Sequence, residues 1–239
     1  RALGVTSRTE YCKIVSAPDS HYERRQLVNS LTTNVTSFFR EPHHFQTLKD
    51  ELSEVLYAKV KRGKGVRFWS AGCSTGQEAY SIAMVLLEEI PDAANQDIKI
   101  LATDIDQNVL ETAKSGGFTE SQLTSLSRDR KQRFFQSKGT RNSGQQGLRI
   151  TDDVRRLVTF RNLNLLDHWP MKREFDAIFC RNVVIYFDKV SQNCLWPRFE
   201  KSCLPGGLFF LGHSERLDEQ YRGDFRSFGT TTYRRETTI

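Results

Sequence analysis

Two acidic residues, Glu78 and Asp104, follow short apolar runs at positions where a carboxylate can hold a ligand. The first run ends at Gly72, and a turn containing Gly76 leads into a predicted helix that carries Glu78 in its first turn. The second run, residues 98–102, is followed two residues later by Asp104. In a doubly wound α/β sheet, ligands bind at the carboxyl ends of such strands. We expect Asp104 to accept hydrogen bonds from both hydroxyls of an adenosine ribose, and Glu78 is suited to an ammonium group.

The turn itself does not match a dinucleotide-binding fingerprint. Only Gly72 and Gly76 are glycines, and Asp104 comes later than the usual ~20 residues. Gly72-x-Ser74-x-Gly76 also matches the nucleophile elbow of α/β hydrolases, for which His213 is an available partner. That motif needs an upstream oxyanion loop and several strands, whereas a predicted helical region precedes it here. We therefore favour a cofactor site.

Asn34, Thr36 and Arg40 belong to a segment, residues 31–42, that is dense in short polar side chains and contains two phenylalanines. One interpretation is a helix cap that leads into a hydrophobic staple. The other is a polar lid in which these three residues cover the cofactor.

Two later clusters follow the third and fourth predicted strands. Residues 162–167 (NLNLLD) come where an adenine ring would lie, held by a backbone amide and a short polar side chain. An ordinary polar turn is the alternative. Residues 179–188 come at the end of the fourth strand, which faces the reacting centre in a doubly wound sheet. In this segment Arg181, Asn182 and Tyr186 are suited to steering a carboxylate.

Elements that would position these residues can be read from apolar periodicity. Residues 6 to ~53 are predicted to be helical and to form a separate domain (1–53), followed by a linker over 54–65. The basic run from Lys59 to Gly65 is interpreted as a solvated connector, with a basic patch as the alternative. From residue 66, predicted strands alternate with helices, which implies a mostly parallel sheet with right-handed crossovers. The strands are 66–70, 98–103, 157–160, 175–180 and 208–211, the helices are 77–89, 106–115 and 188–203, and residues 225–235 form an antiparallel edge pair.

One segment, residues 117–156, interrupts this alternation. A structureless loop of this length is improbable inside a compact domain. We therefore predict an inserted β-subdomain made of one helix and a short β-meander.

Composition limits the classes of partner and compartment. The chain has 35 basic and 29 acidic residues, a net charge of +6 that suits an acidic protein partner, an anionic cofactor or nucleic acid. Five cysteines without a C-x-x-C pair favour reduced thiols in a cytosolic protein. The histidines form no metal-binding pattern, and no apolar run reaches the ~20 residues of a membrane span. No signal peptide is recognised. Because the chain begins with Arg1 rather than Met, we expect further residues upstream.

Six segments, taken together and in this order, resemble the chemotaxis receptor methyltransferases of the CheR type. They are LTTNVTSFFREPHHF, FWSAGCSTGQEAYSIAM, ILATDIDQNVLETAKSGGF, NLNLLD, FDAIFCRNVVIYFDK and PGGLFFLGHSE, and the resemblance extends from about residue 6 to 235. The combination is highly specific, although each segment alone is not.

This resemblance implies a small helical N-terminal domain, a linker and an S-adenosylmethionine (SAM)-dependent methyltransferase domain (66–239) with a Rossmann-like sheet and an inserted β-subdomain. The implied reaction transfers the methyl group of SAM to glutamate side chains in the cytoplasmic helical domain of chemoreceptors. The products are glutamate methyl esters and S-adenosylhomocysteine, and the modification serves sensory adaptation. We expect a monomeric cytoplasmic protein that neither binds nucleic acid nor inserts into a membrane.

The resemblance also assigns cofactor contacts along the chain. The assigned residues are Asn34, Thr36, Arg40, Ala71, Gly72, Glu78, Asp104, Asn164, Leu165, Arg181 and Asn182. Glu78 would meet the methionine ammonium, Asp104 the ribose, and Asn164 with Leu165 the adenine. Arg181 and Asn182 would flank the methionine end, and no metal is expected.

Catalytic roles are expected for Arg181 and Tyr186, which would orient the acceptor carboxylate by hydrogen bonding. Arg8 and Lys13 of the first helix would meet acidic methylation helices of a receptor, and a solvated face is the alternative.

The chain departs from the family pattern in two places. It has Gln77-Glu78-Ala79-Tyr80 where many members have Glu-Glu-Pro-Tyr, and Pro197 lies within a helix that it should kink. Residues 139–147 lie where some members grip a receptor's C-terminal pentapeptide, and their composition does not decide whether this chain does so.

Two rival functions remain from other classes. One is a non-catalytic module that binds SAM as a sensor or scaffold. The other is a nucleic-acid methyltransferase, which is disfavoured because the Asn/Asp-Pro-Pro-Tyr/Phe turn of amino-group methyltransferases is absent and the positive charge is dispersed.

Overall fold

The computed structural model describes residues 5, 7–31, 34–90, 92–137 and 147–237, and the chain divides into two compact units, Arg1–Asn34 and Val35–Ile239. In the first unit, α1 (Arg8–Ser16) begins after Ser7, whose hydroxyl accepts the backbone amide of Glu10 at 3.1 Å. The Arg24 side chain joins α2 (His21–Leu31) to it by donating from Nε to the carbonyl oxygen of Val15 at 2.7 Å. Both helices lie where the sequence predicts them.

The second unit begins with a continuous helical stretch. It consists of α3 (Pro42–Glu51), the π-helical turn η1 (Leu52–Leu56) and α4 (Tyr57–Lys61). Leu48, Leu52 and Leu56 recur every four residues and are buried in the same core as α5 (Gln77–Glu89). This differs from the predicted boundary at residue 53, because the apolar face of the stretch packs within the sheet unit.

The predicted linker over residues 54–65 is correspondingly shorter in the structure. Helical residues continue to Lys61, and the connection to the first strand takes residues 62–65. Lys59, which was expected in a solvated connector, is half-buried, and its Nζ lies 2.5 Å from Oδ1 of the buried Asp176. The end of α4 is therefore held to the sheet by an ion pair, where a solvated linker was expected.

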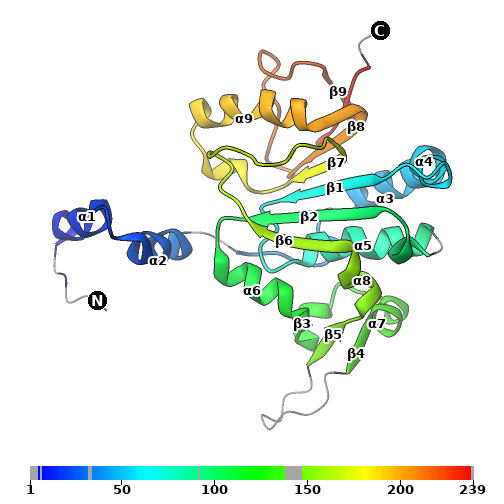
Figure 1. Cartoon of the computed structure of the whole chain (residues 1–239), viewed down its shortest axis with the longest axis horizontal. Helices are drawn as coiled ribbons and strands as arrows, with labels where there is room; N and C mark the ends of the chain where they lie inside the picture. Colours follow the sequence, from blue (N-terminus) through cyan, green and yellow to red (C-terminus); the bar gives the residue numbers. More distant parts are fainter. Residues whose placement is uncertain (1–4, 6, 32–33, 91, 138–146, 238–239) are drawn as a thin grey trace. The chain divides into compact units, whose positions relative to one another are not determined.

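Within the described residues, seven strands form one sheet in the order β6-β2-β1-β7-β8-β10-β9 (Figure 1). They are β1 (Val66–Ala71), β2 (Ile98–Asp104), β6 (Val158–Asn162), β7 (Phe175–Cys180), β8 (Cys203–Leu211), β9 (Phe225–Gly229) and β10 (Thr232–Arg235). The pairs β6-β2, β2-β1, β1-β7 and β7-β8 are parallel, whereas β8-β10 and β10-β9 are antiparallel. The predicted doubly wound, mostly parallel sheet and its antiparallel edge are confirmed.

Strand order reverses beside β1. From β1 the chain extends through β2 to β6, and it then returns to place β7 and β8 on the other side of β1. The segments that follow β1 and β7 therefore leave adjacent parallel strands at the same edge of the sheet. Doubly wound sheets bind their ligands at this reversal point.

Alternate strand residues contribute to two hydrophobic cores, one on each face of the sheet. In β1, Phe68 belongs to the core that includes α3 and α5, whereas Trp69 and Ala71 belong to the other core. The second core includes α9 (Lys189–Ser202), and the ring centroid of Trp69 lies 5.4 Å from that of Phe199. The helix α9 extends past Pro197 as one element within the predicted range 188–203, so Pro197 does not interrupt it.

Four further helical elements are short or lie on the face of the sheet that is covered by the first core. They are η2 (Ala93–Asn95), α6 (Gln107–Ser115), α8 (Asp152–Leu157) and η4 (Val184–Tyr186). α6 begins at Asp106, whose Oδ1 accepts the amide of Asn108 at 2.8 Å, and it ends at Gly116 with φ +64°. The predicted helix over 106–115 is therefore confirmed with both of its caps.

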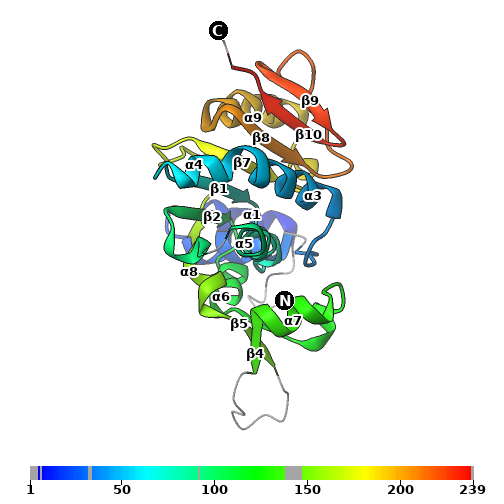
Figure 2. The ribbon, with the colours of Figure 1, turned by 90° about the vertical axis from the view of Figure 1, so that its right-hand side faces the viewer.

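An inserted subdomain follows α6. A second, three-stranded antiparallel sheet has the order β3-β5-β4 and consists of β3 (Gly117–Phe118), β4 (Phe135–Ser137) and β5 (Leu148–Ile150). The 3₁₀ turn η3 (Glu120–Leu123) and α7 (Arg128–Phe134) connect β3 to β4. Figure 2 shows this sheet at the opposite end of the unit from β9 and β10. The predicted insertion is confirmed, but β5 lies between β3 and β4, so the strands do not form a sequential meander. Residues 139–146 of the expected pentapeptide loop lie outside the described residues.

The five cysteines are all free thiols, in agreement with the prediction from their spacing. In the part of the chain that the structure describes, no helix combines the length and apolar character that crossing a membrane requires.

Candidate active site

The turn after β1 is connected to the end of β2 by backbone hydrogen bonds. The amides of Gly72 and Cys73 both donate to the carbonyl oxygen of Thr103, at 2.8 and 2.9 Å. Gly72 has φ +82°, and a Cβ at this position would lie 2.3 Å from Cγ2 of Val183, in the segment after β7. The turn therefore requires glycine twice over, for its backbone conformation and for its close approach to the neighbouring segment.

Asp104 is buried where β2 ends, and both of its carboxylate oxygens accept backbone amides. Oδ2 accepts the amide of Ser74 at 2.8 Å, and Oδ1 accepts the amide of Asp106 at 2.9 Å. Burial raises the pKa of Asp104 above its usual value, although these amide contacts oppose the rise. The carboxylate is thus held firmly at the carboxyl edge of the sheet, where the ribose of a nucleoside was expected.

Glu78 lies in the first turn of α5 and has two side-chain partners. Ser70 donates from Oγ to Oε1 at 2.6 Å, and Arg181 donates from Nη1 to Oε2 at 3.2 Å. Burial raises the pKa of Glu78, while the positive charge of Arg181 acts in the opposite direction. Residues of β1, α5 and the end of β7 therefore meet at this carboxylate.

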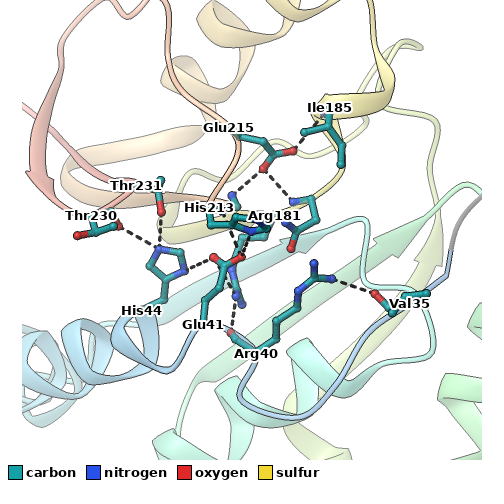
Figure 3. Close-up of polar contacts among 12 residues, drawn as sticks. Val35, Arg40, Glu41, His44, Arg181, Ile185, His213, Glu215, Thr230 and Thr231 are labelled. Atoms are coloured by element: carbon teal, nitrogen blue, oxygen red, sulfur yellow. Dashed lines mark hydrogen bonds and ion pairs between the residues drawn. The ribbon is translucent and has the colours of Figure 1, made fainter.

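The Arg181 guanidinium is buried and engaged by the protein itself. Besides Glu78, its Nη2 lies 3.3 Å from Oε2 of Glu41 and donates to the carbonyl oxygen of Arg40 (Figure 3). The guanidinium also lies over the ring of Phe45, 5.6 Å from its centroid. These contacts suit a residue that fixes other groups, and they differ from the expected contact with an acceptor carboxylate.

Residues 35–41 are held against the sheet unit by contacts at several points. Arg40 donates from Nη1 to the carbonyl oxygen of Val35 at 3.0 Å, and the amide of Phe39 donates to Oγ of Ser81 in α5 at 3.0 Å. Phe38 is buried, with its ring centroid 4.9 Å from that of Phe118 in the inserted subdomain. The segment therefore joins α5 to the insertion and brings Arg40 to Arg181.

The other two residues of the expected lid are placed differently. Thr36 lies in the held segment and is half-buried. Asn34 is the last residue of the first unit, which is separate from the unit that contains this site. Thr32 and Thr33 lie outside the described residues.

Asn164 and Leu165, expected at the adenine, follow β6. Asn164 Oδ1 accepts the amide of Leu166 at 3.0 Å, so its side chain shapes the turn. Leu165 is buried, and its carbonyl oxygen accepts Nε1 of Trp169 at 3.0 Å and Nη1 of Arg198 at 2.8 Å. The turn is thus an ordered feature at the end of the sheet.

Tyr186 and Asn182 lie in the segment after β7. Tyr186 ends η4 with 59% of its surface exposed, and Ile185 before it is 45% exposed. Asn182 adopts φ +58°, which an asparagine tolerates better than most residues. The segment therefore presents Tyr186 to solvent at the edge of the sheet where Glu78 and Asp104 lie.

Three side chains of this region were not assigned a role from the sequence, namely Glu41, His44 and Glu215, and His213 was considered only in the hydrolase alternative. Glu41 lies between Arg181, His44 and His213 (Figure 3), with Oε1 3.2 Å from Nδ1 of His213 and Oε2 3.4 Å from Nδ1 of His44. Burial raises its pKa, but the charge of Arg181 and the hydrogen bonds from His213 outweigh this and hold the pKa below its usual value. A positive φ of 56° at Glu41 could not be recognised in the sequence.

His44 is fully buried, and its Nε2 contacts Oγ1 of Thr231 at 2.9 Å and the carbonyl oxygen of Thr230 at 3.2 Å. Burial and the nearby charge of Arg181 lower its pKa from 6.5 to about 3. Adjacent histidines gave no metal pattern in the sequence, although ligand atoms of Glu41, His43 and His44 lie within 4.8 Å of one another. The Arg181 guanidinium already contacts Glu41, and the expectation of no metal remains a prediction.

The hydrolase alternative required His213 to serve Ser74. The structure places the exposed His213 against Glu41 instead, and it turns Ser74 into a left-handed position (φ 49°) that delivers its amide to Asp104. Both residues of the alternative therefore have other structural roles.

A mostly parallel sheet with reversed order beside β1, a buried carboxylate at the end of β2 and a half-buried one in the first turn of α5 define a Rossmann-like α/β protein of the class that binds a nucleoside-containing ligand. The chain belongs to the CheR methyltransferase family, since the family model "CheR methyltransferase, SAM binding domain" matches residues 34–234.

Curated relatives agree with this assignment over most of their length. A "Probable chemotaxis protein methyltransferase" of Rhizobium etli is 43% identical over 99% of this chain and 88% of the relative. "Chemotaxis protein methyltransferase 2" of Pseudomonas aeruginosa is 42% identical over 88% and 73%, and "Chemotaxis protein methyltransferase" of Escherichia coli is 40% identical over 98% and 78%. The predicted SAM-dependent methyltransferase activity and its cofactor are therefore confirmed at the level of the family.

Proposed function

We propose that this protein transfers the methyl group of SAM to glutamate side chains in the cytoplasmic helical domain of chemoreceptors. The products are glutamate methyl esters and S-adenosylhomocysteine, and the reaction serves sensory adaptation. Support comes from the family, from the chemotaxis names of the relatives, and from a site that provides for a cationic donor. We also propose that the protein acts as a monomer in the cytoplasm.

Two carboxylates, those of Asp104 and Glu78, support the proposed donor site. Asp104, held by the amides of Ser74 and Asp106, would accept the ribose hydroxyls, and Glu78 would accept the methionine ammonium. Gly72 leaves room where a Cβ would collide with Val183, which suits a backbone that must approach a ligand. These features fit SAM, which supplies a methyl group already activated on a sulfonium.

Further donor contacts would come from residues around this pair. They are Asn34, Thr36 and Arg40 from the N-terminal side, Ala71 from the end of β1, Asn164 and Leu165 from the turn after β6, and Arg181 with Asn182 from the segment after β7. The fixed positions of Arg40, Leu165 and Asn182 in the structure support their assignment.

One observation carries the proposal: Arg181 is buried with one positive charge between the carboxylates of Glu41 and Glu78. When both carboxylates are ionised, this cluster has one negative charge in excess. A buried excess charge is unfavourable unless it is paired, so the cluster favours a ligand that brings positive charge. We propose that Arg181 orients Glu78 for this ligand, in place of the contact with the acceptor that the sequence suggested.

The acceptor requires little chemical activation. A glutamate carboxyl with an ordinary pKa of about 4.3 is ionised at neutral pH, so no general base is needed. What the protein must provide is alignment and exclusion of water, which can lower the barrier by on the order of 7–11 kcal/mol. Tyr186, exposed beside the donor site, is the group we propose to orient the acceptor carboxylate through its hydroxyl.

Methyl transfer to a soluble chemoreceptor fragment tests the proposal. With methyl-labelled SAM, we expect the chain to label the fragment and the label to leave as methanol in base, because a carboxyl ester is base-labile. A fragment with glutamine in place of the acceptor glutamates is the matched control and should stay unlabelled. Base-stable label, label on nucleic acid, or donor binding without any transfer would contradict the proposal.

A further inference from the structure

The buried carboxylate of Glu215 accepts four backbone amides. Oε2 accepts Gly212 at 2.6 Å and Asn182 at 2.8 Å, while Oε1 accepts Val183 at 2.9 Å and Ile185 at 3.2 Å. Glu215 is only 3% exposed, and Figure 3 shows it beside Ile185 and above Arg181. One side chain from the segment after β8 thus organises the segment after β7.

The segment is also held by the buried Val184 and by Nε2 of Gln192, which donates to the carbonyl oxygens of Val184 and Phe187 at 2.8 and 2.9 Å. Asn182 holds a left-handed φ of 58°, and the single 3₁₀ turn that follows cannot satisfy its own first amides. Ile185 and Tyr186 are 45% and 59% exposed, so packing of these side chains does not fix the turn. A charged acceptor forms stronger hydrogen bonds to amides than a neutral one does.

The segment is also pressed closely against the residue that begins the Glu215 loop. A Cβ on Gly212 would lie 2.4 Å from Nδ2 and 2.7 Å from the amide nitrogen of Asn182. Glycine at this position therefore allows the two segments to approach, and the Glu215 carboxylate then joins them. The position of the segment after β7 is therefore set by residues that follow β8.

We propose that Glu215 is a positioning residue for methyl transfer. It fixes the backbone from Asn182 to Ile185 so that Tyr186 presents its hydroxyl to the acceptor at the edge of the donor site. This inference rests on the function proposed above. Glu215 itself need not contact donor or acceptor.

The donor carboxylates are held by other groups. Glu78 is held by Ser70 and Arg181, and Asp104 by the amides of Ser74 and Asp106. Of the proposed donor contacts, Asn182 is held by Glu215 through its backbone amide, whereas these two carboxylates keep their own partners. Loss of the Glu215 contacts should therefore disturb the acceptor side of the site more than donor binding. A displacement of the order of 1 Å in such a position can lower turnover by about 100-fold.

Glu215→Gln keeps the side-chain volume but replaces one acceptor oxygen with an NH₂ group that cannot accept an amide. We expect the kcat for receptor methylation to fall by at least about tenfold, and donor affinity measured by calorimetry to change by less than about threefold. Hydrogen exchange should accelerate at residues 182–185 and 212. Glu215→Asp keeps the charge and should retain part of the activity.

Gly212→Ala disturbs the same segment without altering the carboxylate, and it should reproduce the loss of kcat. Glu200→Gln is the matched control, because Glu200 accepts the amide of Asp224 at 2.7 Å in a different loop. We expect its kcat and the exchange of residues 182–185 to equal those of the wild type.

Two results would overturn the proposal. One is a wild-type kcat in Glu215→Gln and Gly212→Ala, and the other is unchanged exchange at residues 182–185 in Glu215→Gln. An equal loss of kcat in Glu200→Gln would also overturn it, since the effect would then be general. If the wild-type chain fails to methylate receptor fragments, the proposed function fails, and the exchange measurement still decides whether Glu215 fixes the segment.

Discussion

The carboxylates of this site differ in the direction in which their surroundings shift the pKa. Burial raises the pKa of Asp104 and Glu78, whereas Arg181 and His213 hold the pKa of Glu41 below its usual value. Glu78 also contacts Arg181, and Asp104 also accepts two amides, but at these two carboxylates burial outweighs the contacts. At Glu41 the contacts with Arg181 and His213 outweigh burial. A ligand's positive charge or hydroxyl groups would therefore stabilise the ionised forms of Asp104 and Glu78 more than that of Glu41.

Asp104→Asn tests the ribose assignment. An amide group can accept fewer hydrogen bonds and would oppose one of the two backbone amides that now contact the carboxylate. We expect SAM affinity measured by calorimetry to fall about 10- to 100-fold, as for the loss of a hydrogen bond to a charged group. Asp153→Asn, an exposed carboxylate in α8, should bind SAM as the wild type does. Undiminished affinity in Asp104→Asn would refute the assignment.

Tyr186→Phe tests the proposed acceptor contact. Tyr186 is 59% exposed, so removal of its hydroxyl should cost little stability. We expect kcat for receptor methylation to fall about fivefold, with SAM affinity changed by less than about twofold, because one hydrogen bond contributes roughly 1 kcal/mol. Tyr22→Phe, an exposed tyrosine of α2, is the control. If kcat in Tyr186→Phe equals that of the wild type, Tyr186 is not a catalytic residue.

His44 predicts a pH dependence of stability. Its pKa is about 3 in the folded protein and about 6.5 when unfolded, so between these values the unfolded chain binds more protons. The free energy of unfolding should therefore fall as the pH decreases below 6.5, by at most about 1.4 kcal/mol per pH unit from this residue. Urea unfolding near pH 7.5 and near pH 5 should show a smaller fall in His44→Gln than in the wild type. Equal falls would contradict the assignment.

At the scale of elements, the site depends on how closely the segments after β1, β2 and β7 approach one another. Thr103 accepts two amides from the turn after β1, and Val183 fills the space beside Gly72. Strand residues alternate between two cores, so both faces of β1 are covered and its end is held rigidly. The precision of the site thus comes from strands that are buried on both faces.

Gly72→Ala tests this close approach. The new Cβ would lie 2.3 Å from Val183 and would also occupy a left-handed φ of 82°. Gly63→Ala is the control, because Gly63 has φ +69° and no atom within 4 Å of its Cβ position, so it carries the backbone strain without the collision. We expect Gly63→Ala to lose about 1 kcal/mol in urea unfolding, and Gly72→Ala to lose about 1–3 kcal/mol more and to bind SAM at least about tenfold more weakly. Equal losses would show that the collision is relieved.

At the scale of the whole molecule, the chain combines a sheet unit that contains the site with a first unit of two helices. All described residues of the two hydrophobic cores come from Phe38 onward, so the sheet unit has its own core. The basic residues Arg8 and Lys13 lie on exposed positions of α1. A role in receptor docking remains a prediction for this unit.

Reversal of both charges, Arg8→Glu with Lys13→Glu, should slow receptor methylation about 3- to 10-fold at low salt and weaken its salt dependence. The physical reason is that exposed charges steer association, and salt screens them over about 10 Å at 0.1 M. SAM affinity should not change. Arg62→Glu with Lys64→Glu, in the exposed connection before β1, is the matched control. A salt dependence equal to that of the wild type would favour a solvated face.

How much could be predicted from the sequence depends on the distance between partners along the chain. Strands, helices, caps and the turn at Gly72 follow from local periodicity and from residues a few positions apart. Asp104 was assigned because it comes at the end of a predicted strand, and Glu78 because it lies in the first turn of the helix that follows another strand. The predicted domain boundary at residue 53 differs from the compact unit that ends at Asn34, since periodicity identifies a buried face of a helix but not the surface against which it is buried.

The sequence by itself determined the doubly wound sheet, the inserted subdomain, the family and the two carboxylates at the strand ends. The tertiary structure decided what Arg181, His44 and Glu215 do. Arg181 contacts Glu78 across 103 positions, and His44 contacts Thr231 across 187. No local pattern encodes such pairs, because folding alone brings these groups into one buried volume, where each charge or polar group must find its partner.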